Sequence, residues 1–158
     1  MGFSAGGHVA GGLLTRFAEP LYRPLDAADQ VSARPDIACL MYAVISTQPG
    51  IAYAGFQEMM RGGEGAAAAL RRSIERHVPP NSPPTLLCHA ADDATVPVGN
   101  SLAMFQGLRA AGVPAELHVF EDGAFRPYKP GASSLPTAPS SADWYRGWRD
   151  HLEFAVIG

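Results

Sequence analysis

Residues 37–45, Ile-Ala-Cys-Leu-Met-Tyr-Ala-Val-Ile, form an unbroken apolar run, which constrains the fold more than any other feature of the chain. A strand buried on both faces of a parallel sheet has such a run, whereas a half-exposed strand alternates apolar and polar residues. Two further strand-like runs occur at 85–89, Thr-Leu-Leu-Cys-His, and at 115–120, Ala-Glu-Leu-His-Val-Phe. Segments with helical periodicity separate the runs. Strands that alternate with helices predict an α/β domain with about three parallel strands flanked by helices.

A first helix is predicted over 8–17, because apolar residues recur there at every fourth position. These residues are Val9, Leu13 and Phe17, with Leu14 alongside. Three glycines in or beside this segment lower its helix propensity, but they also permit close approach to a sheet. They are Gly7, Gly11 and Gly12.

Further helices are predicted over 66–77, 101–111 and 141–156. In the second of these, Leu102, Phe105 and Leu108 are expected to face inward. Residues 48–63 show no clean period and are predicted to be loop or cap, and the four prolines within 126–140 predict a loop there. We therefore expect a single domain over 1–158, in which 48–82 forms a cap or insert.

The composition excludes several classes of protein. At 158 residues and net charge −3, the chain offers no basic patch for nucleic acid and no polybasic segment for a membrane. Its apolar runs are far shorter than the ~20 residues of a membrane helix, and with no recognisable signal peptide we expect a cytoplasmic protein. Cys39 and Cys88 lie in strand-like runs and are expected to be buried free thiols. No zinc spacing, phosphate loop or dinucleotide fingerprint is present, so we expect no metal and no cofactor.

The segment 2–6, Gly-Phe-Ser-Ala-Gly, fits the pattern G-x-S-x-G. In a nucleophile elbow of this pattern, the serine lies on a strained turn between a strand and a helix, and its hydroxyl is exposed. The small residues two before and two after the serine let the backbone turn tightly. Because helical periodicity begins just after Ser4, the pattern has the context that an elbow needs.

An acidic pair, Asp92 and Asp93, follows the apolar run at 85–89. Functional groups of α/β sheets lie at the carboxyl ends of strands. A carboxylate in such a position can orient an imidazole and stabilise its charged form during acyl transfer. We expect Asp93 to point toward this edge of the sheet on the side of Ser4, and Asp92 to be more solvated or to cap the loop.

Four blocks of this sequence resemble the second half of the α/β-hydrolase esterase/lipase family, and in particular its acetyl-esterase and acetylxylan-esterase-like branch. They are the sequences at 2–8, 34–46, 89–98 and 112–120, which come in the family order. The resemblance implies a partial α/β-hydrolase fold that acts on a small-molecule ester. It also implies that Ser4 is the nucleophile, Asp93 the acid of a catalytic triad, and the N–H of Ala5 an oxyanion donor.

The chain departs from this family at the general base. The family carries Gly-Gly-His-Gly-Phe after its last strand, whereas residues 121–126 read Glu-Asp-Gly-Ala-Phe-Arg. Either two residues are deleted or Phe125 stands in the histidine position. The histidines present are predicted to be poor substitutes; they are His8, His77, His89, His118 and His151. Without a base, Ser4 is a neutral hydroxyl and a weak nucleophile.

The early strands and the His-Gly-Gly-type oxyanion loop of the family are also missing. The strand over 37–45 is then expected to be an open apolar edge, which promotes association. We expect a homo-oligomer or a complementing N-terminal half instead of a stable monomer. The segment 2–4 is expected to be held by a partner or displaced from elbow geometry.

The sequence thus predicts a serine carboxylesterase for small acyl esters such as acetyl esters, with impaired activity in this chain. Two alternatives remain open. One is a non-catalytic, self-associating remnant of an α/β-hydrolase. The other is a peptidase of the same fold, because an elbow and an acid do not distinguish esters from amides.

Overall fold

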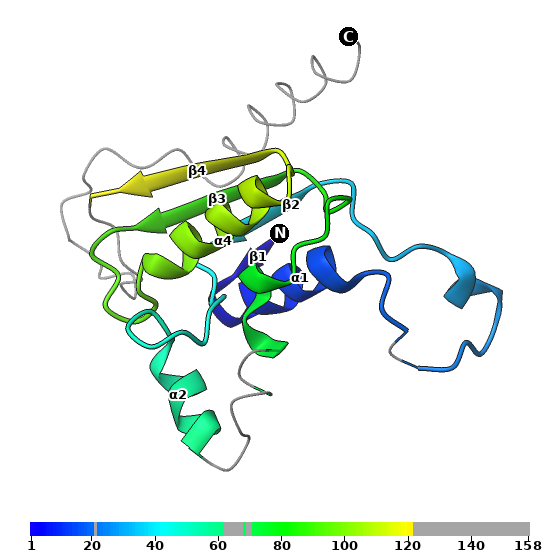
Figure 1. Ribbon diagram of the computed structural model, residues 1–158, viewed down its shortest axis with the longest axis horizontal. Coiled ribbons are helices and arrows are strands. Elements are labelled where there is room, and N and C mark those ends of the chain that lie inside the picture. Colours follow the sequence, from blue (N-terminus) through cyan, green and yellow to red (C-terminus); the bar gives the residue numbers. More distant parts are fainter. Residues whose placement is uncertain (21, 62–67, 69–70, 122–158) are drawn as a thin grey trace, which may run out of the picture. The chain divides into compact units, whose positions relative to one another are not determined.

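The computed structural model describes residues 1–20, 22–61, 68 and 71–121, which form a parallel four-stranded sheet with helices against it (Figure 1). The strands, in spatial order, are β1 (Gly2–Phe3), β2 (Ala38–Met41), β3 (Thr85–Ala90) and β4 (Ala115–Phe120). The helices are α1 (Ser4–Arg16), α2 (Ala54–Arg61) and α4 (Gly99–Ala110), with 3-10 turns η1 (Ala27–Gln30) and η2 (Ile74–Arg76). The predicted α/β class is confirmed.

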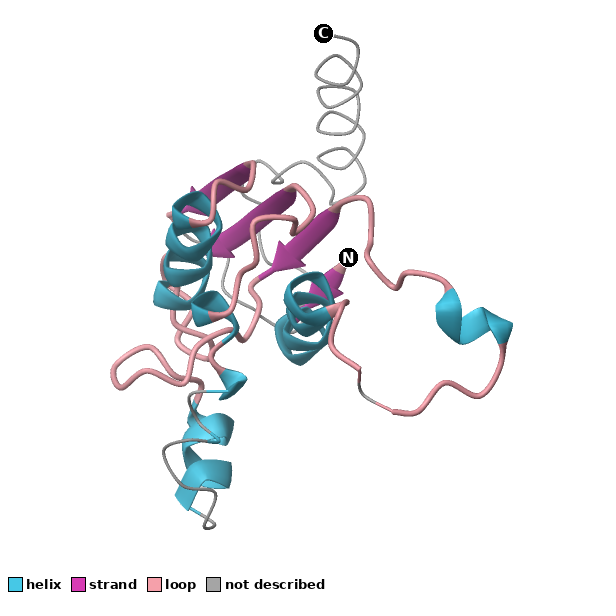
Figure 2. Ribbon diagram, turned by 45° about the vertical axis from the view of Figure 1, so that its right-hand side comes forward, coloured by secondary structure: helices cyan, strands magenta, loops and turns pink. Residues whose placement is uncertain are grey.

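Helices α1 and α4 lie on the same side of the sheet, α1 against β1 and β2 and α4 against β3 and β4 (Figure 2). The sheet presents Leu40, Leu87 and Leu117 to these helices, in register across three strands. Because side chains of a strand alternate between faces, these leucines form one apolar row. Buried residues from both helices and the segments between them complete the core; they are Leu14, Ile45, Ile74, Met104 and Leu108.

The sheet has one strand more than expected, and the predicted open edge is therefore wrong over part of its length. Gly2 and Phe3 pair in parallel with Leu40 and Met41, so β1 is the outermost strand on that side. Two residues ahead of Ser4 are enough to start the pairing. The expectation that segment 2–4 lacks a strand, and needs a partner to keep elbow geometry, is also wrong.

Helix α1 begins four residues earlier than predicted, and its apolar stripe faces outward. Val9 is 72% exposed and Leu13 is 45% exposed. The buried positions are Gly7, Gly11, Leu14 and Thr15. A glycine face lets the helix backbone approach the sheet closely. The periodicity thus identifies the helix correctly but does not identify its buried side.

Helix α4 matches the prediction over 101–111, except that Leu102 is 44% exposed and Met104 is fully buried instead. Helix α2 lies in the segment predicted to be loop or cap. Of the helix predicted over 66–77, residues 66, 67, 69 and 70 lie outside the described residues, whereas 68, 71 and 72 are helical and the segment ends in the η2 turn. The loop predicted over 126–140 and the helix over 141–156 lie outside them as well.

The opposite face of the sheet carries the two cysteines. Cys39 and Cys88 are buried and free, as predicted. Burial raises the pKa of both thiols, that of Cys88 to about 12. They are therefore protonated near neutral pH and unreactive. Among the described residues, no helix is long and apolar enough to cross a membrane.

The glycine face of α1 generates a stability prediction. A Cβ on Gly7 would lie within 3.0 Å of Ala43, whereas a Cβ on Gly12 would meet no atom within 4 Å. Gly7→Ala should lower the free energy of unfolding by about 1–3 kcal/mol through overpacking. Gly12→Ala, the matched control in the same helix, should raise it by about 0.5–1 kcal/mol. Urea denaturation measures both changes, and equal effects of the two variants would contradict the close approach.

Candidate active site

Ser4 lies at the junction of β1 and α1 with a φ of +50°. A left-handed backbone is uncommon for a residue other than glycine and costs of order 1–3 kcal/mol. The Ser4 carbonyl accepts a hydrogen bond of 3.1 Å from the N–H of Val44, in the chain that leaves β2. The pairing of β1 with β2 fixes the chain before Ser4, and the bond from Val44 fixes Ser4 itself. The strand, strained turn and helix have the geometry that G-x-S-x-G requires.

Two glycines make the tight turn sterically possible, and one of them is not in the motif. A Cβ on Gly2 would lie within 3.0 Å of the Gly6 carbonyl oxygen. A Cβ on Gly6 would meet nothing within 4 Å, whereas one on Gly7 would collide with Ala43. The residue after the serine that must stay small is therefore Gly7.

The first turn of α1 has no side-chain cap. Phe3, at the N-cap, makes no side-chain hydrogen bond, and the turn contains no acidic residue. The first N–H groups of a helix lack partners within it and lie at the positive end of its dipole. The N–H of Ala5 is one of them, and Ala5 is exposed. Such a group can stabilise negative charge that develops beside Ser4.

Asp93 follows the carboxyl end of β3 and is buried, whereas its neighbour Asp92 is exposed. One carboxylate oxygen of Asp93 accepts backbone hydrogen bonds from Thr95 (2.8 Å) and Val96 (2.9 Å). The other oxygen lies 3.7 Å from Nε2 of His89. The predicted difference in solvation between the two aspartates is confirmed, although Asp93 caps its own loop.

Ser4 and Asp93 lie after parallel strands, at the same edge of the sheet. Strand β2 separates β1 from β3, so these strands are about 10 Å apart at ~4.8 Å per neighbour. In the described part of the chain, no hydrogen bond joins the two side chains. A third group is needed to connect them, which is the place of the imidazole in a triad.

His89 is buried and has a partner for each ring nitrogen. Nε2 lies 2.8 Å from the Val96 carbonyl oxygen, and Nδ1 lies 2.8 Å from Oγ of Ser101. Because a carbonyl only accepts, the proton is assigned to Nε2, and the Ser101 hydroxyl donates to Nδ1. Burial lowers the pKa of His89, against smaller opposing effects of Val96 and Asp93. The neutral ring is thus hydrogen-bonded to the loop that follows Asp93, through the Val96 carbonyl.

His8 lies one turn after Ser4 on α1. Its Nδ1 lies 3.1 Å from the carbonyl oxygen of Val44, so this nitrogen carries the proton of the neutral ring. The ring packs edge-on against Phe56 of α2, with 4.9 Å between ring centroids. Burial lowers the pKa of His8, and this effect outweighs the bond to Val44. Val44 thus joins Ser4 and His8 through the two ends of its backbone.

The remaining histidines are not near this arrangement or are not described. His118 pairs with Glu116 on β4 at 2.7 Å, and His77 is exposed at the end of η2. His151 and Phe125 lie outside the described residues. In the described part of the chain, no cluster of histidine, cysteine or acidic side chains could hold a metal ion.

Sequence reasoning missed two residues that shape the site. Tyr42, at the end of β2, has a φ of +37° and donates its N–H to the Cys88 carbonyl at 2.7 Å. Nothing in the sequence marks this tyrosine as left-handed. Ser101 was missed as the partner of His89, although a polar residue in the first turn of a predicted helix could have drawn attention to it.

Comparison with known proteins places the chain in a family. The family model described as the prolyl oligopeptidase family matches residues 1–149. Endo-1,4-beta-xylanase B of Butyrivibrio fibrisolvens is 32% identical over 123 residues, which cover 78% of this chain and 19% of that protein.

Solved structures of esterases show the same fold. An acetyl ester-xyloside bifunctional hydrolase from Caldicellulosiruptor lactoaceticus is 39% identical with a TM-score of 0.70, over 78% of this chain and 45% of that one. The carboxylesterase Cest-2923 from Lactobacillus plantarum is 27% identical with a TM-score of 0.54, over 78% and 43%. The chain therefore spans less than half of these relatives. Its sheet and helices are part of an α/β-hydrolase fold, and the chain belongs to the prolyl oligopeptidase family.

Proposed function

We propose that this chain carries the nucleophile and acid of a serine ester hydrolase for small acyl esters such as acetyl esters. The observation that carries the proposal is Ser4, held in a left-handed turn between β1 and the uncapped start of α1. Asp93 at the same edge of the sheet supports it. The names of the relatives, an acetyl ester-xyloside hydrolase and a carboxylesterase, support the class of substrate.

The proposed reaction is acyl transfer. The Ser4 oxygen attacks the ester carbonyl carbon, an imidazole takes the serine proton, and the N–H of Ala5 binds the oxyanion that forms. The alcohol leaves with that proton, and water then hydrolyses the acyl-enzyme. Asp93 orients the imidazole and stabilises its charge.

The imidazole is the missing part of this scheme. Residues 121–126 contain no histidine. Both nitrogens of His89 have partners, and one nitrogen of His8 is bonded to Val44. We therefore propose that the chain alone is a weak catalyst, because removing one member of a triad costs several orders of magnitude in rate.

A peptidase is the second candidate, favoured by the description of the matching family model. The elbow and the acid serve either reaction, because both proceed through a tetrahedral oxyanion. Peptide substrates distinguish the two. A non-catalytic remnant that only associates is the third interpretation, and it is tested by the same assays.

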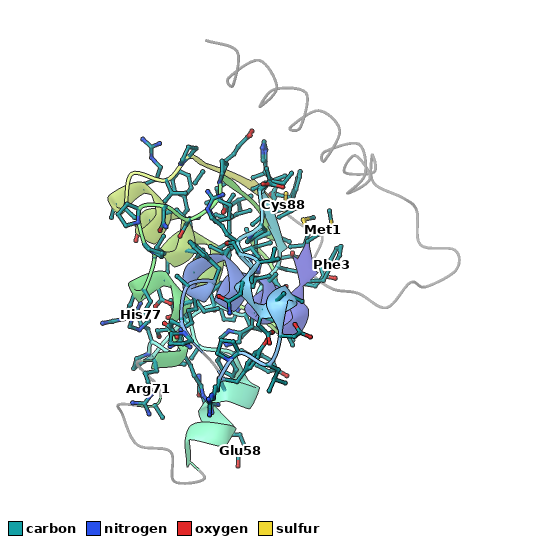
Figure 3. All side chains as sticks on the ribbon, turned by 90° about the vertical axis from the view of Figure 1, so that its right-hand side faces the viewer. Met1, Phe3, Glu58, Arg71, His77 and Cys88 are labelled. Atoms are coloured by element: carbon teal, nitrogen blue, oxygen red, sulfur yellow. The ribbon has the colours of Figure 1, made fainter. Side chains whose placement is uncertain are left out.

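We also propose that the β1 edge is covered by a second copy of the chain or by a complementing N-terminal half. The β1–α1 side exposes large apolar residues, which are Met1 (55%), Phe3 (43%), Val9 (72%) and Leu13 (45%). Met1 and Phe3 lie together at this edge (Figure 3). An outermost strand with exposed apolar neighbours is a template for pairing. The free thiols of Cys39 and Cys88 support a reducing, cytoplasmic location.

The activity proposal is tested with p-nitrophenyl acetate. We expect turnover well below ~1 per second, the lower end of the typical range. Ser4→Ala should abolish it and Asp93→Asn should reduce it, while Asp92→Asn, the matched control, should leave it unchanged. Wild-type turnover inside the range of ~1–1000 per second would refute the impairment. Equal rates for wild type and Ser4→Ala would refute the nucleophile.

The neutral state of His89 predicts a pH dependence of stability. Its folded-state pKa is lowered from 6.5, so the unfolded chain takes up a proton first as the pH falls. The free energy of unfolding should therefore decrease from about pH 6.5 downward, and level off below the folded-state pKa. Urea denaturation at about pH 7.5 and about pH 5.5 measures this loss. His89→Gln should reduce the pH dependence, with His77→Gln as a surface control; an unchanged dependence would rule out a neutral His89.

The β1 edge predicts association. Light scattering of the chain alone at micromolar concentration should give a mass above that of one chain. Leu13→Lys should weaken the association, because a charge on this face is costly to bury. Leu102→Lys, which alters an equally exposed leucine on α4, is the control. A monodisperse, cooperatively unfolding monomer would overturn the proposal.

A further inference from the structure

The segment between β2 and η2 is closed at its base by a cluster of side chains that we name the Glu75 clasp. Its members are Ser46, Thr47, Gln48, Ser73 and Glu75. Oε1 of Glu75 accepts hydrogen bonds from Ser46 (2.7 Å) and Gln48 (2.8 Å). Ser73 bonds Thr47 twice, from the Thr47 N–H at 3.0 Å and between the two hydroxyls at 2.7 Å. Residues 26 to 29 positions apart in the sequence are thereby joined.

The clasp is buried, although its centre is a carboxylate. Glu75 is 8% exposed and Ser73 is 1% exposed. Oε2 of Glu75 is buried and has no hydrogen-bond partner among the residues that the structure describes. A buried carboxylate with an unpaired oxygen contributes little to stability, and apolar side chains in place of Glu75 and its partners would pack as well. What the carboxylate adds is a fixed position for the two ends that it joins.

The closed segment contains α2, and α2 brings Phe56 to His8. The two rings meet edge-on at 4.9 Å between centroids. His8 is bonded to the Val44 carbonyl, and the N–H of Val44 is bonded to Ser4. The η2 end of the clasp is attached to the same stretch of chain, because the Ile74 N–H donates to the Ile45 carbonyl at 3.3 Å. Phe56 is therefore connected to Ser4 through His8 and Val44.

We propose that Glu75 is a positioning residue, which locks the base of the segment 48–73 and so holds Phe56 of α2 as a wall beside Ser4 that limits the size of the acyl group. This role rests on the proposed hydrolase function. The charge of Glu75 acts on the pKa of His8 and raises it, whereas those of Arg72 and Arg16 lower it.

The first test follows the position of Phe56 and needs no activity. The NMR signals of the His8 ring protons, assigned by their loss in His8→Gln, report the ring current of Phe56. Phe56→Leu removes that ring current and gives the reference shift. Glu75→Ala should move the signals toward this reference, and Glu75→Gln, whose amide oxygen can accept the same two bonds, should restore the wild-type shift. Glu58→Ala, on the exposed side of α2, is the control.

If Glu75→Ala does not fold, Ser73→Ala replaces it, since this variant removes both bonds to Thr47. Signals of His8 that stay at the wild-type position in a folded clasp variant would overturn the positioning role.

The second test follows selectivity. The ratio of kcat/KM for p-nitrophenyl acetate to that for p-nitrophenyl butyrate should fall in Phe56→Leu and Glu75→Ala, by at least about threefold, since one methylene in a pocket is worth up to about 200-fold. In the double variant, which combines Phe56→Leu and Glu75→Ala, the ratio should fall no further than in Phe56→Leu alone, because both substitutions act through one contact. If the wild type is active and every variant keeps its ratio, Phe56 does not limit the size of the acyl group. No Ser4-dependent activity in any protein, with the NMR shifts as expected, would refute the proposed function and leave the positioning intact.

Discussion

The close approach of α1 to the chain leaving β2 is the contact on which the rest of the site depends. Gly7 lies so near Ala43 that any side chain would collide. This proximity allows Val44 to bond Ser4 through its N–H and His8 through its carbonyl. The left-handed turn at Ser4 is a strained conformation, which persists only where surrounding contacts over-determine it. Here those contacts are made by neighbouring backbone, which cannot rearrange independently of the sheet.

Asn100 extends this arrangement to the second half of the sheet. Its side-chain oxygen accepts the N–H groups of Ile45 and Ser46, each at 2.9 Å. Its side-chain nitrogen donates to the carbonyls of Ile51 (2.6 Å) and Pro97 (2.9 Å). The buried amide thus joins the chain after β2 to the loop that carries Asp93. A fully satisfied buried polar group of this kind fixes one geometry, because every alternative leaves a donor or acceptor unpaired.

The sequence was sufficient for β2, β3 and β4, but not for the two-residue strand β1 or for which side of α1 is buried. The segments 85–89 and 115–120 became β3 and β4. The first is largely apolar and fully buried, as expected of a strand covered on both faces, whereas Glu116 and His118 alternate with apolar residues in the second and β4 is only partly buried. Helix α1 misleads in this respect, because its buried face is made of glycine and its apolar residues Val9 and Leu13 face outward. Hydrophobic periodicity assumes that burial is achieved by large side chains, and that assumption fails where backbones touch.

The candidate site was predictable to the extent that it is encoded locally. The elbow is a five-residue pattern, and the acidic pair Asp92 and Asp93 directly follows a predicted strand, although only Asp93 is buried. The positive φ of Tyr42 and the clasp at Glu75 are determined by contacts between segments far apart in the sequence. No pattern within a short window contains that information. Residue type alone would in fact place Glu75 on a solvated helix face.

The backbone geometry of Ser4 and the chemistry that would activate its hydroxyl are separable in this chain. The contacts that hold Ser4 come from β1, from Gly7 and from Val44, all within the first 44 residues of the sequence. None of these contacts places a proton acceptor at the Ser4 hydroxyl. An elbow with a strained serine therefore indicates a fold and a position that suits a nucleophile. Turnover depends in addition on a group that lowers the cost of removing the hydroxyl proton, which the elbow itself does not supply.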